Sequence, residues 1–539
     1  MTSLMKCENH APSSMSTTLT WLIVFFLDSD AYLPCQVTAV SDPFDANYSC
    51  IVLVATSIDA VDDSWTQIKG ALQSRSKIDA SFNSGTHILE VTNRALIYAP
   101  TGPLNRDYDD VRRITDAAKA GINRASKAES KRPLLILPSE TPFPHSFESG
   151  VLGALSAAYV PLELREARQT RYIEELGVFV RNENEKSLIP FLSAIESGRL
   201  VCRDIGGSDP ERMAPPNAAN YVQDVFKDTP VKVQVISDVE TIGKEYPLFA
   251  AVNRCSETVP RHNGRIVYLE YNGEGTPDET LLLVGKGVTM DTGGADLKVG
   301  GAMRGMNRDK CGAATVAGFF QILARFRPKN IRVLGGLALV RNSIGTDCYV
   351  CDEIITSRAG VRVRVVNTDA EGRMAMCDVL CRMKELAQNE VNPHIMTIAT
   401  LTGHAVIAVG TSYSCVLDNG PAKKVQTACK LQCAGDEVGD PLEISTLRRE
   451  DYDFVGPESV YEDVRQCNDL PSSRTPRGHQ FPAAFMIRAS GLDKFGIDAE
   501  NPIRYTHFDI AGSAGLSPRV IPTAAPLPAL AQRYLRDRS

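Results

Sequence analysis

Six acidic and basic side chains fall in three short segments of the sequence. The first segment is rich in glycine and places an acid between two lysines (VGKGVTMDTGGADLK), the second places an acid ahead of a run of small residues, and the third reads NTDAEGR. Four carboxylates that converge repel one another, and oxygen-bound divalent cations are a standard counterbalance. Two such ions about 3.5–4 Å apart form a common hydrolytic centre. The side chains are Lys286, Asp291, Lys298, Asp309, Asp369 and Glu371.

Each segment taken alone also fits a structural role. An acid–x–acid pair such as Asp369 and Glu371 is typical of a solvated turn, and Asp309 suits the start of a helix. If residues 369–371 are locally extended, however, the two carboxylates project from the same side and can approach one pair of cations. The chemical interpretation therefore depends on the three segments together.

Several familiar catalytic patterns are absent. The sequence holds no GxSxG nucleophile elbow, no HExxH zinc helix and no GxxxxGK-S/T phosphate loop. Cys348 and Cys351 form a CxxC pair, but no second pair follows at zinc-finger spacing. We interpret these cysteines as small buried side chains rather than as a structural zinc site.

The composition indicates a globular protein without a basic surface field. Of the 539 residues, 43% are hydrophobic and 23% are charged, and the formal net charge is −7. This balance disfavours nucleic acid and membrane as partners. Fourteen cysteines in a chain of this length are well below the density of proteins held together by disulfide bonds, so we expect reduced thiols.

One apolar run near the start bears on the location of the protein. The run from Leu19 to Leu27 is about half the length of a membrane-spanning helix. It could be the apolar part of a signal peptide, but only Lys6 supplies positive charge before it. We expect a cytoplasmic protein, and secretion is the alternative.

The chemical segments are preceded by a part of the chain without such motifs. Residues 1–48 are predicted to be an N-terminal extension that is a candidate for disorder, and residues 49–205 an N-terminal α/β domain with strands near 51–55 and 134–137. Glycine and proline cluster between residues 206 and 216 and predict a domain boundary. A second domain would then span residues 206–539.

Strand-like and helix-like segments alternate in this second domain. The pattern predicts strands at 281–284, 331–340 and 395–401 and amphipathic helices at 312–325 and 374–386. The fold class is therefore α/β, with two αβα domains and, in the second, a mostly parallel central sheet flanked by helices. Ligands bind beyond the carboxyl ends of such strands, which is where Lys286, Asp291 and Thr402 fall.

Taken together, the segments resemble the leucyl aminopeptidase family of two-metal exopeptidases. The signature of that family, Asn-Thr-Asp-Ala-Glu-Gly-Arg, is complete at residues 367–373. Its VGKG block with the following lysine and acid is matched at 284–298 and 309–315, and residues 400–403 and 509–512 also fit. The segments MDTGG at 290–294 and RNSIGTD at 341–347 resemble the worm-type branch, and the match covers about 281–530.

The resemblance implies a metallo-aminopeptidase catalytic domain at 206–539 with two metal sites. Lys286, Asp291, Asp309 and Glu371 would hold one ion, and Asp291, Asp369 and Glu371 the other. The ions would be Zn²⁺ or Mn²⁺ or both, with Mg²⁺ a third candidate. A lysine ligates only as the neutral amine, so the ions would have to lower the pKa of Lys286. Lys298 would stabilise the oxyanion, and Arg373 would hold a bicarbonate that acts as general base.

The resemblance also implies the substrate and the assembly. One ion would take the free α-amine of a peptide, so the N-terminal residue would be removed. Thr400, Leu401 and Gly403 would hold the peptide, and Met306 would line an apolar pocket that favours leucine or a similar side chain. Relatives usually form homo-hexamers, which we expect here.

Three residues depart from the family pattern, and two rival functions stay open. Lys310 and Cys311 replace a smaller, uncharged pair after Asp309, and His404 stands where small residues are usual. A non-catalytic binding protein is one rival. A two-metal hydrolase of another bond, such as a phosphoester, is the second, but only Arg308 and Arg373 lie near enough in sequence to clamp a phosphate.

Overall fold

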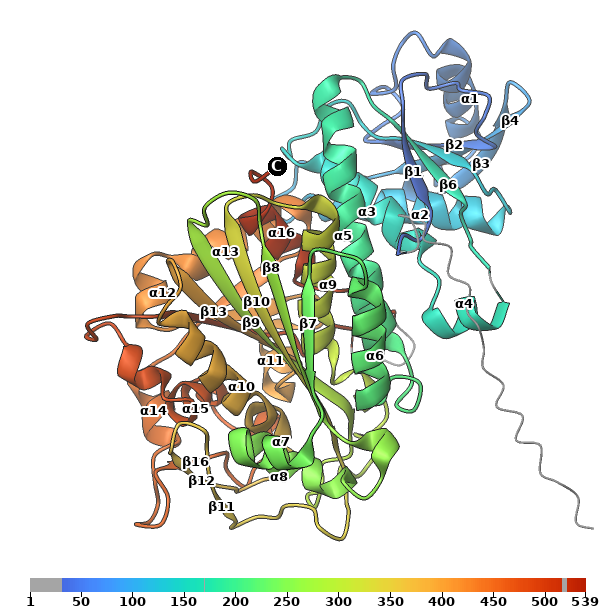
Figure 1. Cartoon of the computed structure of the whole chain (residues 1–539). Coiled ribbons are helices and arrows are strands. Elements are labelled where there is room, and N and C mark those ends of the chain that lie inside the picture. The colour runs from blue at the N-terminus through green and yellow to red at the C-terminus, as the bar shows by residue number, and fades with distance from the viewer. Residues whose placement is uncertain (1–31, 169, 516–520) are drawn as a thin grey trace, which may run out of the picture.

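In the computed structural model, residues 32–168, 170–515 and 521–539 are described, and they form two large β-sheets with helices packed on them (Figure 1). A third, three-stranded sheet lies beside the second large one, near α7 and α8 (Figure 1). The expected α/β class, with mostly parallel sheets flanked by helices, is confirmed. Within the described residues, no helix combines the length and the apolar character that crossing a membrane requires.

The first sheet has six strands in the order β1-β6-β5-β2-β4-β3. All neighbours are parallel except β3 and β4, which form an antiparallel hairpin. β2 is buried along its whole length, as its unbroken apolar run predicts for a strand covered on both faces. The strands are β1 (Gln36–Val40), β2 (Cys50–Ala55), β3 (His87–Val91), β4 (Arg94–Pro100), β5 (Pro133–Ile136) and β6 (Glu175–Phe179), and the helices are α1 (Thr66–Ser76), α2 (Arg112–Lys127), α3 (Ser146–Ala158) and α4 (Leu162–Arg168).

This sheet begins earlier than the expected boundary at residue 49. β1 pairs in parallel with β6, from Gln36 opposite Glu175 to Val40 opposite Phe179, so residues 36–40 belong to the sheet and not to an extension. The sequence gives little sign of this strand because β1 is a short edge strand in which only Val40 is fully buried. The run at residues 19–27 lies outside the described residues.

The second sheet has eight strands in the order β15-β14-β17-β13-β9-β10-β8-β7. Its centre, from β17 to β10, is parallel, and the edges are joined to it by antiparallel pairing. The predicted strands near 281, 331 and 395 are confirmed as β9, β10 and β13, which are neighbours in the sheet. The bounds are β7 (Lys232–Ile236), β8 (Arg265–Asn272), β9 (Glu279–Asp291), β10 (Ile331–Asn342), β13 (Pro393–Ala399), β14 (Ser414–Asp418), β15 (Leu442–Thr446) and β17 (Arg504–Asp509), and the small sheet has β11 (Ile354–Thr356), β12 (Arg362–Arg364) and β16 (Val464–Arg465).

Two apolar cores lie on opposite faces of this sheet. Leu281 and Leu283 of β9 pack into one core with α5 and α9, whereas Leu282 and Val284 pack into the other with α8, α10 and α15. This alternation follows from the two-residue period of a strand. The helices are α5 (Glu183–Gly207), α6 (Pro215–Phe226), α7 (Val239–Glu245), α8 (Pro247–Asn253), α9 (Cys311–Phe326), α10 (Glu371–Ala387), α11 (Gly403–Val409), α12 (Gly420–Lys424), α13 (Thr427–Val438), α14 (Arg449–Phe454), α15 (Phe481–Ala489) and α16 (Leu527–Tyr534).

The long helix α5 crosses the expected boundary between residues 205 and 206: it begins beside the first sheet and runs along α9 of the second domain (Figure 1). Its last residues, Gly206 and Gly207, which the sequence predicts to be turn residues, are helical. A Cβ atom on Gly206 would lie 2.8 Å from Cys311 Sγ, so this glycine permits close packing of α5 against α9. Composition alone cannot separate a glycine that permits packing from one that permits a turn.

Candidate metal centre and active site

The three carboxylates with the closest approach come from three different elements. Asp291 ends β9, Asp309 follows the short 3-10 turn Met306–Arg308 ahead of α9, and Glu371 begins α10. Their side chains are buried and offer oxygen atoms that all lie within 4.8 Å of one another. Within the described residues, no other group of three or more His, Cys, Asp or Glu side chains converges in this way, so Cys348 and Cys351 belong to no such cluster.

Lys286 is the counter-ion at the centre of this cluster. Its Nζ lies 2.8 Å from Asp309 Oδ2 and 2.9 Å from Glu371 Oε1, and it donates to the carbonyl oxygen of Thr400 at 2.9 Å. Burial lowers the pKa of Lys286, but the neighbouring carboxylates, Asp309 first, outweigh it and raise the pKa above the ordinary value. Without metal the residue is therefore an ammonium.

The path of the Lys286 side chain explains the glycine in the third segment. A Cβ atom on Gly372 would lie 2.3 Å from Lys286 Cε. Any larger residue there would displace the lysine from the carboxylates, because Lys286 is fixed at its tip by three contacts.

The chain at residues 369–371 is not extended, so the condition under which both carboxylates would project from one side is not met. The amide of Ala370 donates to the carbonyl of Asn367, the amide of Asp369 donates to Asn367 Oδ1 at 2.8 Å, and Glu371 is already helical. This turn sends the two acids to different lysines: Glu371 to Lys286, and Asp369 to Lys298. Side-chain hydrogen bonding by asparagine, which favours turns, outweighs the extended form.

Lys298 bridges the second pair of acids. Its Nζ lies 3.0 Å from Asp291 Oδ2 and also contacts Asp369 Oδ1. Burial lowers the pKa of Lys298, but Asp291 and Asp369 outweigh it and raise the pKa, so the residue stays charged. The pKa of Asp369 is raised to about 7, first by burial and then by the charge of Asp291. Burial likewise raises the pKa of Asp309 well above its ordinary value, against the attraction of Lys286.

This donor set fits divalent cations. Asp309 Oδ2 and Glu371 Oε1 are buried and, among the residues that the structure describes, have no hydrogen-bond partner beyond the ion pair with Lys286. Buried carboxylate oxygens are the ligands that hard divalent ions prefer, and the two lysine ammoniums occupy positions where cationic charge is needed. All five expected ligands are thus brought together. Asp309 and Glu371 contact Lys286, Asp291 and Asp369 contact Lys298, and Asp291 joins the two pairs because its side chain lies within 4.8 Å of those of Asp309 and Glu371.

Sequence reasoning missed Asn342, at the end of β10. This fully buried side chain donates from Nδ2 to Asp291 Oδ1 at 2.8 Å and to the carbonyl of Thr368 at 3.1 Å. It therefore orients one carboxylate and ties it to the turn that carries two more. Asn342 lies inside the segment RNSIGTD that carried the family resemblance, which was the only available signal.

Two further positioning residues hold the turn at 367–370 and were also missed. Asp296 Oδ2 accepts from the amide of Thr368 at 2.7 Å, and Gln466 Nε2 donates to the carbonyls of Asn367 and Ala370 at 2.7 and 3.0 Å. Cys351 donates to the same carboxylate oxygen of Asp296 at 3.3 Å and is exposed rather than buried, so its expected burial is wrong.

The four expected substrate-binding residues lie around the cluster in different ways. Thr400 Oγ1 donates to Asp309 Oδ1 at 2.8 Å, so Thr400 also supports a carboxylate. The amide of Leu401 donates to Asp509 Oδ1 at 3.2 Å, and that of Gly403 to Ser472 Oγ at 3.0 Å. Met306 is half-buried and begins the turn before Asp309.

Arg373 is a buried residue in the first turn of α10. Its Nη1 donates to the carbonyl of Gln466 at 2.8 Å, and its guanidinium lies 5.1 Å from the centre of the Phe481 ring. Its Nε has no hydrogen-bond partner among the described residues. A planar donor of this kind could still take a small planar anion.

Two of the residues that depart from the family pattern point to structural roles. The Nζ of Lys310 donates to the carbonyl of Ser208 at 2.9 Å and to that of Asn307, and burial lowers its pKa to about 8. Cys311 is buried, and burial raises its thiol pKa to about 11, so it is an inert thiol at neutral pH.

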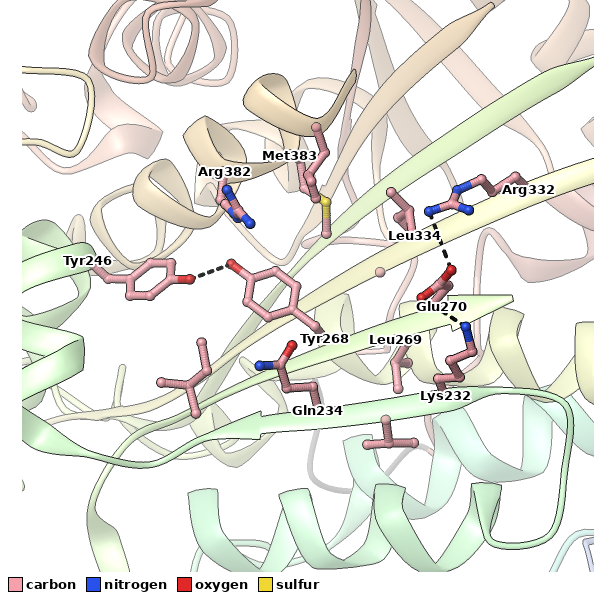
Figure 2. A pocket seen from close by; sticks show the side chains of 14 residues that line it. Lys232, Gln234, Tyr246, Tyr268, Leu269, Glu270, Arg332, Leu334, Arg382 and Met383 are labelled. Atoms are coloured by element: carbon pink, nitrogen blue, oxygen red, sulfur yellow. Dashed lines mark hydrogen bonds and ion pairs between the residues drawn. The ribbon is translucent and has the colours of Figure 1, made fainter. Parts of the chain in front are cut away.

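One cavity lies away from the metal centre. It measures about 420 Å³ and lies between α10 and the face of β7, β8 and β10, near the start of β10 (Figure 2). Asn342 and Asp291 of the cluster lie at the opposite end of β10. Tyr246 and Tyr268 share a hydrogen bond of 3.0 Å there, and each cation of its lining pairs with an acid: Lys232 and Arg332 with Glu270, and Arg382 with Glu385. We assign it no chemistry.

The fold and the buried cluster of acids and lysines at the ends of parallel strands define a metal-dependent hydrolase of the α/β class. Comparison with known proteins makes this specific. Residues 200–527 match the model of the cytosol aminopeptidase family, catalytic domain. The chain therefore belongs to this family and is a metal-dependent aminopeptidase that acts on peptides.

Relatives and solved structures agree with this assignment. A protein of Caenorhabditis elegans that is described as an aminopeptidase is 43% identical over 506 residues, which cover 90% of this chain and 95% of that protein. A protein of Acinetobacter baumannii that is described as a cytosol aminopeptidase is 30% identical over 397 residues, which cover 72% of this chain and 74% of that protein. The same fold occurs in a mutant of tomato leucine aminopeptidase, with TM-score 0.76, 17% identity and coverage of 93% and 97%. It also occurs in the bottromycin maturation enzyme BotP in complex with Mn, with TM-score 0.73, 21% identity and coverage of 90% and 98%.

Proposed function

We propose that the protein removes the N-terminal residue of peptides, preferably leucine or another apolar residue, with the help of two divalent ions. The observation that carries this proposal is the approach of Asp291, Asp309 and Glu371 within 4.8 Å around Lys286, with Lys298 bridging Asp291 to Asp369. Zn²⁺ or Mn²⁺ or both are the proposed ions, and Mg²⁺ is a third candidate.

The ligand roles are carried over from the family resemblance, and the contacts of the acids with Lys286 and Lys298 support them by bringing these side chains together. Lys286, Asp291, Asp309 and Glu371 would hold one ion, and Asp291, Asp369 and Glu371 the other. Bound ions supply Lewis acidity, a site for the free α-amine of the peptide and activation of water. Lys286 must lose its proton when the ion enters, so metal binding should release protons from the cluster.

The remaining charged residues would act on the scissile bond. Lys298 is the proposed oxyanion stabiliser, because its raised pKa keeps the ammonium charged. Arg373 is the proposed holder of a bicarbonate that takes the proton of the attacking water. The general-base role falls to such an anion because Asp291, Asp309, Asp369 and Glu371 are committed to lysines or ions.

The substrate would lie along the segment that follows β13. Thr400, Leu401 and Gly403 are the proposed backbone contacts. The amides of Leu401 and Gly403 already donate within the protein and the carbonyl of Thr400 already accepts from Lys286, so the carbonyl oxygen of Leu401 is the proposed acceptor from the peptide. Met306 is the proposed wall of the pocket for the first side chain. Its unbranched thioether suits flexible apolar side chains such as leucine.

We further propose a cytoplasmic homo-hexamer whose partners are peptides with a free N-terminus. Nucleic acid and membranes are not proposed as partners, because the chain carries a net charge of −7. Mass photometry or light scattering on the purified protein tests the hexamer directly.

The decisive assay compares an L-leucine amide-linked fluorogenic substrate with its N-acetylated form. The protein is dialysed against chelator and then given Mn²⁺, Mg²⁺ or Zn²⁺ separately, with Asp369→Ala as the control variant. Activity on the free-amine form alone, restored by metal and lost in the variant, supports the proposal. If the folded protein hydrolyses neither substrate with any of the metals, a binding role is favoured. If it hydrolyses p-nitrophenyl phosphate instead, a phosphoester substrate is favoured.

A further inference from the structure

A pair of histidines joins the proposed substrate segment to a distant part of the chain. His404 follows Gly403 at the start of α11, and His479 precedes α15 by two residues. Their Nδ1 atoms lie 2.8 Å apart, and their ring centroids are 4.9 Å apart. His404 is one of the residues that depart from the family pattern, so the pair is a feature of this chain that the proposed catalytic roles leave unexplained.

A contact between two Nδ1 atoms imposes a definite protonation state. One Nδ1 must carry a hydrogen and the other must be a free acceptor, so at least one ring is neutral. On its other side, His479 Nε2 lies 2.9 Å from Ser445 Oγ, which also accepts from Gln480 Nε2 at 3.0 Å. If both rings became imidazolium, both Nδ1 atoms would carry hydrogen and the contact would become repulsive.

The pair is one of several contacts between residues 403–404 of the proposed substrate segment and residues 472–479. One residue before His404, the amide of Gly403 donates to Ser472 Oγ at 3.0 Å. A Cβ atom on Gly478 would lie 2.8 Å from the Cβ of His404 and 2.3 Å from the carbonyl oxygen of Ser472, so the two chains can meet this closely only at a glycine. On the other side, Thr402 Oγ1 donates to Asp509 Oδ2 at 2.7 Å.

The groups that face the pair favour its neutral form. Arg477 acts on both rings and is itself held by Asp451 of α14 through a contact of 2.6 Å. Asp451 acts in the opposite direction on the pKa of His479 but more weakly than burial, His404 and Arg477, and His479 in turn lowers the pKa of His507 of β17. Burial, followed by Arg477, lowers the pKa of His404, and burial, followed by His404, lowers the pKa of His479 to about 4. At neutral pH both rings are uncharged and the contact is intact.

We propose that His404 and His479 are positioning residues that hold residues 401–403 in place for the peptide and release them when both rings are protonated. The proposal rests on the proposed function, because it takes this segment to be where the peptide lies. It assigns the pair an effect on substrate binding and none on the metal ions, since neither ring contacts a carboxylate of the cluster.

Three variants separate positioning from simple packing. His404→Phe keeps a ring but removes the hydrogen bond, His404→Gln keeps a donor that does not titrate, and His262→Gln changes a histidine that pairs with Glu211 away from the site. For the fluorogenic leucine substrate with saturating metal at pH 7.5, His404→Phe should raise KM about tenfold with kcat and metal content unchanged, as the loss of one hydrogen bond predicts. His404→Gln and His262→Gln should stay within about twofold of the parent.

The pH profile provides the readout that a merely structural role would not move. A histidine whose folded pKa is lowered loses its contribution as the pH falls below the ordinary value, so KM of the parent and of His262→Gln should rise as the pH falls from 6.5 toward 4. His404→Gln should flatten this rise. An unchanged KM in His404→Phe, or the same acid rise in His404→Gln, overturns the proposal.

Hydrogen–deuterium exchange of residues 401–409 tests the pair independently of activity. Relative to the parent, His404→Phe should lower the protection of this segment, while residues 311–326 of α9 keep theirs. If the parent is inactive with every metal, the proposed function fails but the exchange experiment still decides whether the pair orders the segment. Equal protection in parent and variant overturns the positioning role in either case.

Discussion

Replacing Asn342 with leucine should weaken metal binding through a residue that touches no ion. Asp291 Oδ1 accepts two hydrogen bonds, from Asn342 Nδ2 at 2.8 Å and from the amide of Gly293 at 2.9 Å. Leucine has nearly the same shape but no donor, so Asp291 loses one of these two bonds. The carbonyl of Thr368, which Asn342 also binds at 3.1 Å, loses a partner as well.

The structure sets the size of the effect. Residues that orient a metal ligand typically contribute about 10- to 100-fold to metal affinity, which corresponds to about 1.4–2.7 kcal/mol. The bond to a carboxylate is worth about 1.5–3 kcal/mol of folding stability, and the bond to a carbonyl about 0.5–1.5 kcal/mol. Metal-free Asn342→Leu should therefore unfold at a lower denaturant concentration than the parent.

Competition with a chromophoric chelator measures the metal affinity, and urea unfolding in chelator measures the stability. Asn419→Leu is the matched control, because Asn419 is also buried and donates to the carbonyl of Ile503 at 3.0 Å, far from the cluster. It should lose stability and keep its metal affinity. Unchanged metal affinity in Asn342→Leu, with the stability loss present, would refute the argument that Asn342 orients Asp291.

Three further predictions follow from single contacts. Lys298→Met should lower kcat by about 100- to 1000-fold, as loss of an oxyanion donor does, while elemental analysis shows bound metal. Gly372→Ala should displace Lys286 and abolish tight metal binding by calorimetry, since its Cβ would lie 2.3 Å from Lys286 Cε; full binding would contradict this. Burial raises the folded pKa of Asp378 from 3.8 to about 7, so the folded state holds its proton more tightly than the unfolded state. The free energy of unfolding should then fall as the pH rises from about 4 to 7, and Asp378→Asn should reduce this slope in urea titrations in chelator.

Much of the second domain was predictable because its segments are locally consistent. The apolar run at 281–284 and the four apolar positions of the helix at 312–325 fall in β9 and α9, whose interiors are buried on both sides or nearly so. The predictions of the first strand and of the end of α5 were wrong, because neither feature has an apolar pattern that identifies it in the sequence. β1 is a half-exposed edge strand, and Gly206 near the end of α5 permits packing against Cys311 rather than a turn.

The sequence by itself determined which acids and lysines form the buried cluster and to which family the chain belongs, because these residues and the glycines beside them are grouped in short segments with fixed spacing. Only the tertiary structure decided which acid meets which lysine, since a turn at Asn367 sends Asp369 and Glu371 apart. It also decided the supporting contacts: Asn342 lies 51 residues from Asp291, and His404 lies 75 residues from His479. Such pairs depend on the order of strands in the sheet and on the packing of loops at its edge, and no local pattern of residues encodes either.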